Sequence, residues 1–421
     1  MSDHFRRLAR RSRGRTAGLV AVVVALVVSA VASAGTPRHE LPVRVERFVY
    51  TTHDGKQSYA LLLLPGWYGP GRHPAIPLVI SPHGRNTTPE TAAKRWYDLP
   101  TRGGFAVVLP AGQGRVLQLY SWGYPGQISD LARMPALAEQ AVPFFRYQRR
   151  HVYAIGASMG GQEVLLLLAK HPRMLAGVIA FDPATDLANR YYEFPDITFG
   201  RQDQQRARIE VGGTPGQVPR AYAARSPITY VRRIALSGVP VQVWWSIKDK
   251  VIVNQAQQAG RFYQQIKLIN PAAPVVPYVG TWQHTGEVSA FNQLPAALAR
   301  LGLLPASWLV RDPYRPQVNG GSRTVFSSGR RATDSEVAQM VERSQVELSA
   351  RLESEQRLVS GWWRWGFIAL AALTVALLAG GAVLIGRLRR PAEGERNREP
   401  SQPPNGVVPI EGHHRTTIRA R

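Results

Sequence analysis

The sequence predicts an α/β fold with a mostly parallel central sheet and helices on both faces, followed by a C-terminal transmembrane helix. Short apolar runs alternate with helical patterns of about 10–15 residues, as expected for parallel strands joined by helical crossovers. A glycine-flanked serine follows one of these runs, and residues 366–386 contain no charge. With 421 residues, 44% of them apolar, the chain can bury a large core.

The predicted elements begin with a hairpin over 41–64, where the turn signal HDGKQS separates two apolar runs. Further strands are expected at 76–84, 105–112, 151–156, 175–183, 239–249 and 275–280, and helices at 92–103, 133–145, 160–172 and 254–267. Residues 187–232 lie between two core strands and are expected to form a cap. Together these elements predict one catalytic domain over 38–310.

Both ends of the chain carry signals for export and membrane attachment. Residues 1–34 join a basic start, the apolar run Leu19–Val31 and an Ala-Ser-Ala site, which indicates a signal peptide or an uncleaved membrane anchor. Residues 361–386 predict a transmembrane helix with tryptophans before it and arginines after it. The positive-inside rule then predicts a cytoplasmic, disordered tail at 387–421 and a catalytic domain outside the membrane. Residues 311–360 are expected to be a linker and a charged helical stalk.

The amino-acid composition limits which partners and cofactors are expected. The net charge is +24, but the arginines are scattered, so we expect anionic lipid or an envelope polymer as partner and no nucleic acid. The chain has no cysteine, which excludes disulfides and thiolate metal sites. The ten histidines are scattered and no H-E-x-x-H is present, so no metal and no cofactor is expected.

The serine lies in a G-x-S-x-G motif, Gly156-Ala157-Ser158-Met159-Gly160, between a predicted strand and a predicted helix. In this context the motif forms a sharp turn that exposes the hydroxyl, and a Cβ at either glycine would clash across the turn. Ser158 is therefore predicted to be a nucleophile. The alternative is that Ser158 is merely a small residue in a tight turn.

A serine hydroxyl needs a base, and in this motif class the partners follow in the order Ser, acid, His. Only His284 lies after the penultimate strand and within the domain. Asp249 follows the preceding strand and is the predicted acid, with Asp182 as its rival. The alternatives are a surface-loop role for His284 and helix capping or a lysine ion pair for Asp249.

Two backbone N–H donors are expected to bind the negative oxygen that forms during acyl transfer. One is the N–H of Met159 at the start of the predicted helix. The other comes from the loop Ser81-Pro82-His83-Gly84-Arg85, with Gly84 or Arg85 as donor. His83 is expected to shape this loop.

Over about residues 42–305 the chain resembles the α/β-hydrolases. The motif and HPRMLAGVIAFDP resemble secreted feruloyl esterases and polyhydroxybutyrate depolymerases, and RSPITYVRRIALSGVPVQVWWSIKD resembles prolyl oligopeptidase-type hydrolases. The resemblance implies that Ser158, Asp249 and His284 form a triad. Two departures are Ser246, where glycine is common, and the spacing Gly280-Thr-Trp-Gln-His284.

Taken with the export and membrane signals at the two ends, this resemblance implies a membrane-anchored extracytoplasmic serine hydrolase that cleaves an ester, either a small molecule or an envelope polymer. The alternatives are a serine peptidase of prolyl oligopeptidase type, an acyltransferase acting on cell-envelope components, and an inactive scaffold. Peptidase specificity is not implied, because no β-propeller pattern is evident in the sequence.

Overall fold

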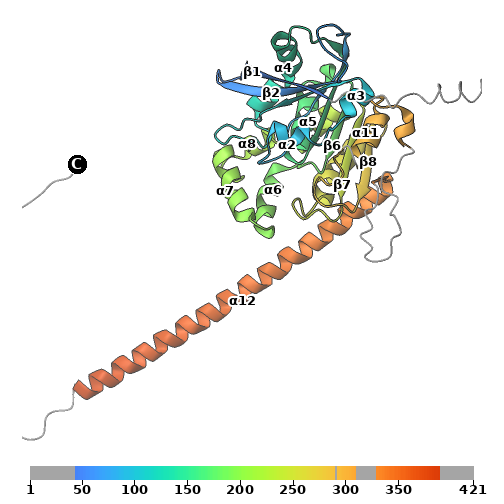
Figure 1. Cartoon of the computed structure of the whole chain (residues 1–421). Helices are drawn as coiled ribbons and strands as arrows, with labels where there is room; N and C mark the ends of the chain where they lie inside the picture. The colour runs from blue at the N-terminus through green and yellow to red at the C-terminus, as the bar shows by residue number, and fades with distance from the viewer. Residues whose placement is uncertain (1–42, 290–291, 310–328, 389–421) are drawn as a thin grey trace, which may run out of the picture. The chain divides into compact units, whose positions relative to one another are not determined.

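The computed structural model describes residues 43–289, 292–309 and 329–388. In these residues one nine-stranded sheet has the order β1-β2-β4-β3-β5-β6-β7-β8-β9 (Figure 1). Its strands are β1 (Arg44–Thr51), β2 (Gln57–Leu64), β3 (Ile76–Ile80), β4 (Ala106–Pro110), β5 (Tyr147–Ala157), β6 (Gly177–Phe181), β7 (Val241–Ser246), β8 (Val275–Gly280) and β9 (Arg330–Arg331). The six strands from β4 to β8 in this order are parallel, whereas β1, β2 and β9 pair antiparallel. The mostly parallel sheet is confirmed.

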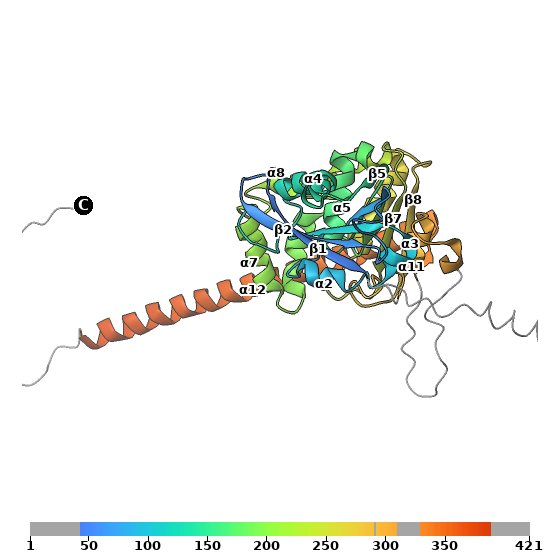
Figure 2. The same ribbon diagram turned by 45° about the horizontal axis from the view of Figure 1, so that its top comes forward.

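Helices cover both faces of the sheet. They are α2 (Pro89–Ala93), α3 (Leu99–Gly103), α4 (Pro125–Ala141), α5 (Met159–Lys170), α6 (Leu187–Glu193), α7 (Gly200–Val211), α8 (Pro219–Ala224), α9 (Val231–Ala235), α10 (Arg261–Ile269), α11 (Leu294–Arg300) and α12 (Asp334–Leu388). Figure 2 shows α4 and α5 on one side of the strands and α2, α3 and α11 on the other.

The alternation of side chains along the strands builds two apolar layers. In β2, Leu62 and Leu64 join the layer with α4, α5 and α10, while Leu61 and Leu63 join the layer with α3 and α11. Because both faces are covered, the central strands are apolar at nearly every position rather than at every second one. These two layers hold the carboxyl ends of β5, β7 and β8 at one edge of the sheet.

Where a cap was expected, residues 187–224 form helices α6 to α8. A third apolar cluster joins these helices to the loop after β4 and to the start of α5. Its buried members are Trp122, Met159, Leu187, Tyr191, Phe194, Ala207, Val211 and Tyr222. The side chain of Met159, next to Ser158, is therefore packed into the cap cluster.

Two predicted helices have other boundaries in the structure. The single helix expected at 92–103 is two five-residue helices, α2 and α3, because Tyr97 between them has a positive φ of 44° and Pro100 starts the second one. The helix expected at 133–145 begins eight residues earlier, at Pro125, and ends at Ala141, before Pro143.

Residues 311–328 of the expected linker lie outside the described residues, and the part that follows differs from the expected linker and stalk. Arg330 and Arg331 form β9 on β8, and the first turns of α12 bury Val337 and Val341 against α10 and the sheet. The helices expected at 336–359 and 361–386 are one continuous helix, α12. The chain divides into two compact units with the boundary at Leu348, and the sheet belongs to the first. The catalytic unit therefore extends beyond residue 310.

The membrane predictions fall largely outside the described residues. Residues 1–34 and 389–421 lie outside them, and within the expected span only 368–377 have described side chains. Among the helices that the structure describes, none is both long enough and apolar enough to cross a membrane.

Candidate active site

Ser158 occupies the sharp turn between β5 and α5. Its backbone has φ 58° and ψ −122°, a combination that L-residues avoid and that costs about 1–3 kcal/mol. The turn is held by the Ser158 N–H, which donates to the Phe181 carbonyl at 2.8 Å. Stored backbone strain of this kind is typical of functional positions.

The two motif glycines are needed for close backbone approach. A Cβ on Gly156 would lie 2.3 Å from the carbonyl oxygen of Gly160, within the motif itself. A Cβ on Gly160 would lie 2.5 Å from the carbonyl oxygen of Pro82, in the loop after β3. No side chain fits at these distances, so the predicted requirement for glycine at both positions is met. The second contact also places the β3 loop directly against the start of α5.

Asp249 and His284 meet at the same edge of the sheet, in the loops after β7 and β8. His284 Nδ1 lies 2.7 Å from Asp249 Oδ2, and the Asp249 side chain is 1% exposed. Asp249 Oδ1 accepts the backbone N–H groups of Val251 and Ile252 at 2.8 and 2.9 Å. Because the carboxylate accepts from Nδ1, that nitrogen carries the proton and Nε2 is left as the basic nitrogen.

Asp249 is ionised in this setting. Burial alone would raise its pKa, but the hydrogen bond and charge of His284 and the N–H groups of Ile252 and Val251 outweigh burial and lower the pKa. An ionised acid at Nδ1 fixes the tautomer of the base and stabilises the imidazolium that forms when the base takes a proton.

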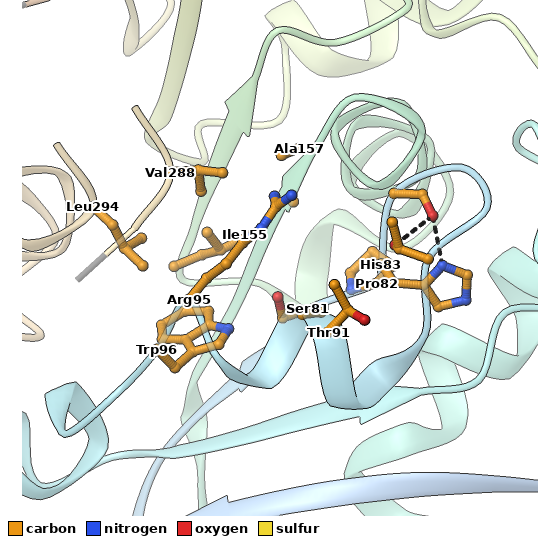
Figure 3. Close-up of a pocket in the computed structure, with 14 residues that line it drawn as sticks. Ser81, Pro82, His83, Thr91, Arg95, Trp96, Ile155, Ala157, Val288 and Leu294 are labelled. Carbon is orange, nitrogen blue, oxygen red and sulfur yellow. Dashed lines mark hydrogen bonds between the residues drawn. The ribbon is translucent and has the colours of Figure 1, made fainter. Parts of the chain in front are cut away.

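The backbone N–H groups that were expected to bind the oxyanion lie in the loop after β3 and at the start of α5. In the described part of the chain, the N–H groups of Gly84, Arg85 and Met159 donate no hydrogen bond and remain available. His83 fixes the loop. Its Nδ1 donates to the Gly84 carbonyl at 2.7 Å (Figure 3). Its Nε2 accepts the Gly112 N–H at 2.7 Å. Burial lowers the pKa of His83, which keeps the ring neutral for this bridging role. His83 therefore shapes the turn, as the sequence suggested.

The side chain of Arg85 points to the cap rather than into solvent. It forms an ion pair with Asp203 of α7. Burial, followed by the charges of neighbouring groups that include Arg190, lowers the pKa of Arg85 to about 10, so the guanidinium stays charged at neutral pH. The ion pair connects the β3 loop to the cap helices.

Asp182, the rival acid, lies beside the base without bonding its ring. Its carboxylate accepts the N–H groups of Ser246 and Thr285 at 2.9 and 2.8 Å and the Trp282 Nε1–H at 3.1 Å. Asp249 therefore bonds the imidazole, whereas Asp182 bonds the loop around it. Ser246 stands where related sequences often have glycine. Its hydroxyl donates to the Trp282 carbonyl at 2.6 Å and so joins the loops that carry Asp249 and His284.

Sequence reasoning missed Glu287, which is fully buried three residues after His284. The only signal for it is an acidic residue in an otherwise uncharged loop close to the expected base.

Polar atoms of Asp182, Asp249 and His284 all lie within 4.8 Å of one another, close enough to hold a metal ion. The donors around them argue against that use. Both oxygens of each carboxylate already accept N–H groups, so no lone pair set converges on a vacant point.

A cavity of about 20 Å³ lies between the β3 loop, the end of β5 and Val288 (Figure 3). The Arg95 side chain runs along it toward Ala157. This volume holds about one water molecule, so the cavity is no acyl pocket.

Most aromatic residues near this edge serve packing. Trp122, Trp244, Trp245 and Trp282 are all 3% exposed or less, whereas Tyr192 on α6 is 62% exposed.

The sheet, the strained serine turn and the His–Asp pair at the carboxyl edge define a class: the protein is a serine hydrolase with an α/β-hydrolase fold. Comparison with known families agrees. The prolyl oligopeptidase family matches residues 132–270, a third of the chain that contains Ser158 and Asp249. This match confirms the resemblance that the sequence indicated.

Similar solved structures include an acylaminoacyl peptidase of Pyrococcus horikoshii, with 15% identity, a TM-score of 0.45 and coverage of 58% of this chain and 38% of that one. A ferulic acid esterase has 17% identity, a TM-score of 0.44 and coverage of 57% and 91%. The fluorophosphonate-binding serine hydrolase F of Staphylococcus aureus has 14% identity, a TM-score of 0.45 and coverage of 64% and 100%. The chain thus spans less than half of the peptidase. No curated protein sequence matches it.

Proposed function

We propose that this protein is a carboxylic-ester hydrolase that works through an acyl-enzyme. Ser158 attacks the ester carbonyl while His284 takes the hydroxyl proton, and Asp249 stabilises the imidazolium. The N–H groups of Met159 and of Gly84 or Arg85 bind the oxyanion. The alcohol leaves with the proton from His284, and a water molecule then attacks the acyl group with His284 again as base, which frees the acid.

The observation that carries this proposal is the 2.7 Å contact between His284 Nδ1 and Asp249 Oδ2, both held by loops at the edge where Ser158 sits. The three residues come from segments 91 and 35 positions apart. Burying an ionised carboxylate costs stability. An inactive scaffold would gain nothing from such a carboxylate bonded to a histidine near a strained serine.

The test is hydrolysis of p-nitrophenyl esters with acyl chains from acetate to palmitate by the parent and by Ser158→Ala. We expect activity in the parent and a loss of at least about 10³-fold in the variant. The chain length with the highest kcat/KM will size the acyl pocket. A parent that hydrolyses no ester, or a variant as active as the parent, would refute the proposal.

A serine peptidase is the second candidate, and the family match over 132–270 favours it. The same triad can cleave an amide or pass the acyl group to an envelope acceptor. Comparing an ester with the amide of the same acyl group, and adding a sugar alcohol as competing acceptor, separates the three reactions.

We further propose that the enzyme is exported and held at the cell membrane by residues 361–386, with the catalytic unit outside. Apolar side chains of α12 support this, because Ile368, Leu370, Leu373, Val375 and Leu377 are each 58–69% exposed. Leu373→Arg with Val375→Arg should move the full chain from the membrane fraction to the soluble fraction. A parent already soluble after cell lysis would contradict this location.

A further inference from the structure

The acid–base end of the site holds more carboxyl groups than a triad uses. Asp182, Asp249 and Glu287, here called the carboxyl cluster, are all buried, at 0%, 6% and 0% exposure. Burying a carboxylate costs several kcal/mol unless hydrogen bonds or a cation compensate, so two extra carboxyls beside the base need an explanation.

Asp182 accepts hydrogen bonds from residues before and after the base. Its Oδ2 accepts the N–H of Thr285, the residue after His284, at 2.8 Å and the Nε1–H of Trp282 at 3.1 Å. Its Oδ1 accepts the N–H of Ser246 at 2.9 Å, at the end of the strand that leads to Asp249. Three N–H donors favour the ionised form of a carboxyl, so Asp182 carries a negative charge close to the imidazole although burial raises its pKa.

Glu287 is different. Neither of its oxygens meets an N–H or O–H donor among the described residues. Burial, and next the charge of Asp182, raise the pKa of Glu287 well above its usual value. A buried carboxylate without hydrogen-bond donors or an ion pair is strongly disfavoured. Glu287 is therefore protonated.

Two cations complete the surroundings of the cluster. Arg190 of α6 acts on Asp249 through its charge and contacts the Val251 carbonyl in the same loop. Arg95, which lines the cavity, acts on Glu287 through its charge but makes no ion pair with it among the described residues. The carboxylates of Asp182 and Asp249 thus act on His284, with one neutral carboxyl and two cations around them.

We propose that His284 is served by two carboxylates. Asp249 bonds its Nδ1, and Asp182 is a positioning residue that fixes the loop of the base and stabilises the imidazolium through its charge. Glu287 keeps its proton throughout and therefore adds no further charge beside Asp182. The inference rests on the proposed function, because it concerns the step in which His284 takes the Ser158 proton.

Three variants separate charge from structure. Asp182→Asn removes the negative charge at nearly constant shape, so the imidazolium is less stable and the midpoint of the acid limb of kcat/KM should fall. Glu287→Gln replaces one neutral polar side chain with another and should leave the midpoint unchanged. Glu287→Leu removes the polar group and leaves the Asp182 charge less compensated, so the midpoint should rise.

The experiment measures kcat and KM for p-nitrophenyl acetate and the rate of labelling by a fluorophosphonate, from about pH 5 to 9, for the full-length parent and the three variants. For Asp182→Asn we expect kcat to fall about 10- to 100-fold, KM to stay within about threefold, and the midpoint to move down by about half a pH unit or more.

Three results would overturn the inference. An unchanged midpoint in folded Asp182→Asn would leave Asp182 a purely structural role. A midpoint lowered equally by Glu287→Gln would move the charge to Glu287. If Asp182→Asn does not fold, identical midpoints in Glu287→Leu and Glu287→Gln would decide against us. Labelling requires only an activated serine, so a parent that is labelled but cleaves no ester refutes the ester proposal and still allows this test.

Discussion

The serine turn and the carboxyl cluster sit at the same edge of the sheet but depend on different physics. The turn consists of neighbouring residues, and its geometry depends on the absence of side chains at Gly156 and Gly160. The cluster joins Asp182, Asp249 and Glu287 from three separate loops and depends on N–H donors and one retained proton. The turn is therefore sensitive to volume, whereas the cluster is sensitive to charge.

The largest effect should come from the cluster. Asp249→Asn keeps the volume but removes the charge at Nδ1 and favours the wrong tautomer of His284, so we expect kcat to fall about 10³- to 10⁴-fold. Steady-state kinetics on the best ester checks this, with Asp182→Asn as the matched control expected to lose far less. Equal losses in the two variants would mean that the cluster has no hierarchy and that Asp249 is not the principal acid.

The next largest effect tests the turn. A methyl group at Gly160 would lie 2.5 Å from the Pro82 carbonyl, so Gly160→Ala must push the β3 loop away. We expect kcat to fall about 10- to 100-fold and the free energy of unfolding to drop by about 2 kcal/mol. Denaturant titration and kinetics measure both. The control is Gly71→Ala, where a Cβ meets nothing within 4 Å. Wild-type activity in Gly160→Ala would show that the close approach has no functional role.

The smallest effect on activity is expected under the turn, where the change is one of stability. Glu163 of α5 is fully buried, hydrogen-bonds to Ser121, and burial raises its pKa from 4.5 to about 8. The folded state keeps this proton while the unfolded state releases it above its own pKa. Stability must therefore fall as pH rises from about 4.5 to about 8, by at most about 1.4 kcal/mol per pH unit.

Glu163→Gln removes this dependence. We expect the variant to gain stability over the parent at pH 8 and to differ little at pH 4.5, as measured by urea unfolding at both pH values. The control is Glu347→Gln, an exposed position on α12. A parent and variant with the same slope against pH would mean that Glu163 is ionised inside the fold.

The same comparison explains what the sequence could predict. The turn could be read directly, because its strand, glycines and helix are contiguous around Ser158. The order of partners along the chain then singled out Asp249 and His284 by elimination. The α/β sheet followed from alternating apolar runs, whereas the split of 92–103 into α2 and α3 depended on a positive φ at Tyr97 that propensities do not reveal.

The cluster was only half predictable. Both Asp182 and Asp249 follow core strands, so the sequence favours Asp249 only through the order of strands, whereas their hydrogen-bond partners in the structure distinguish them clearly. Glu287 carries no motif, and its burial results from long-range packing of the loop after β8. The pairing of β9 with β8 was also unpredictable, because a two-residue strand leaves no periodic signal.

The central claim is that Ser158 is a nucleophile activated by His284 and Asp249. The most direct measurement is peptide mass spectrometry after treatment of the full-length chain with a fluorophosphonate. We expect a single covalent adduct on the peptide that contains Ser158, with its formation slowed strongly by His284→Ala. An adduct on another residue, or no adduct on folded protein, would contradict the account.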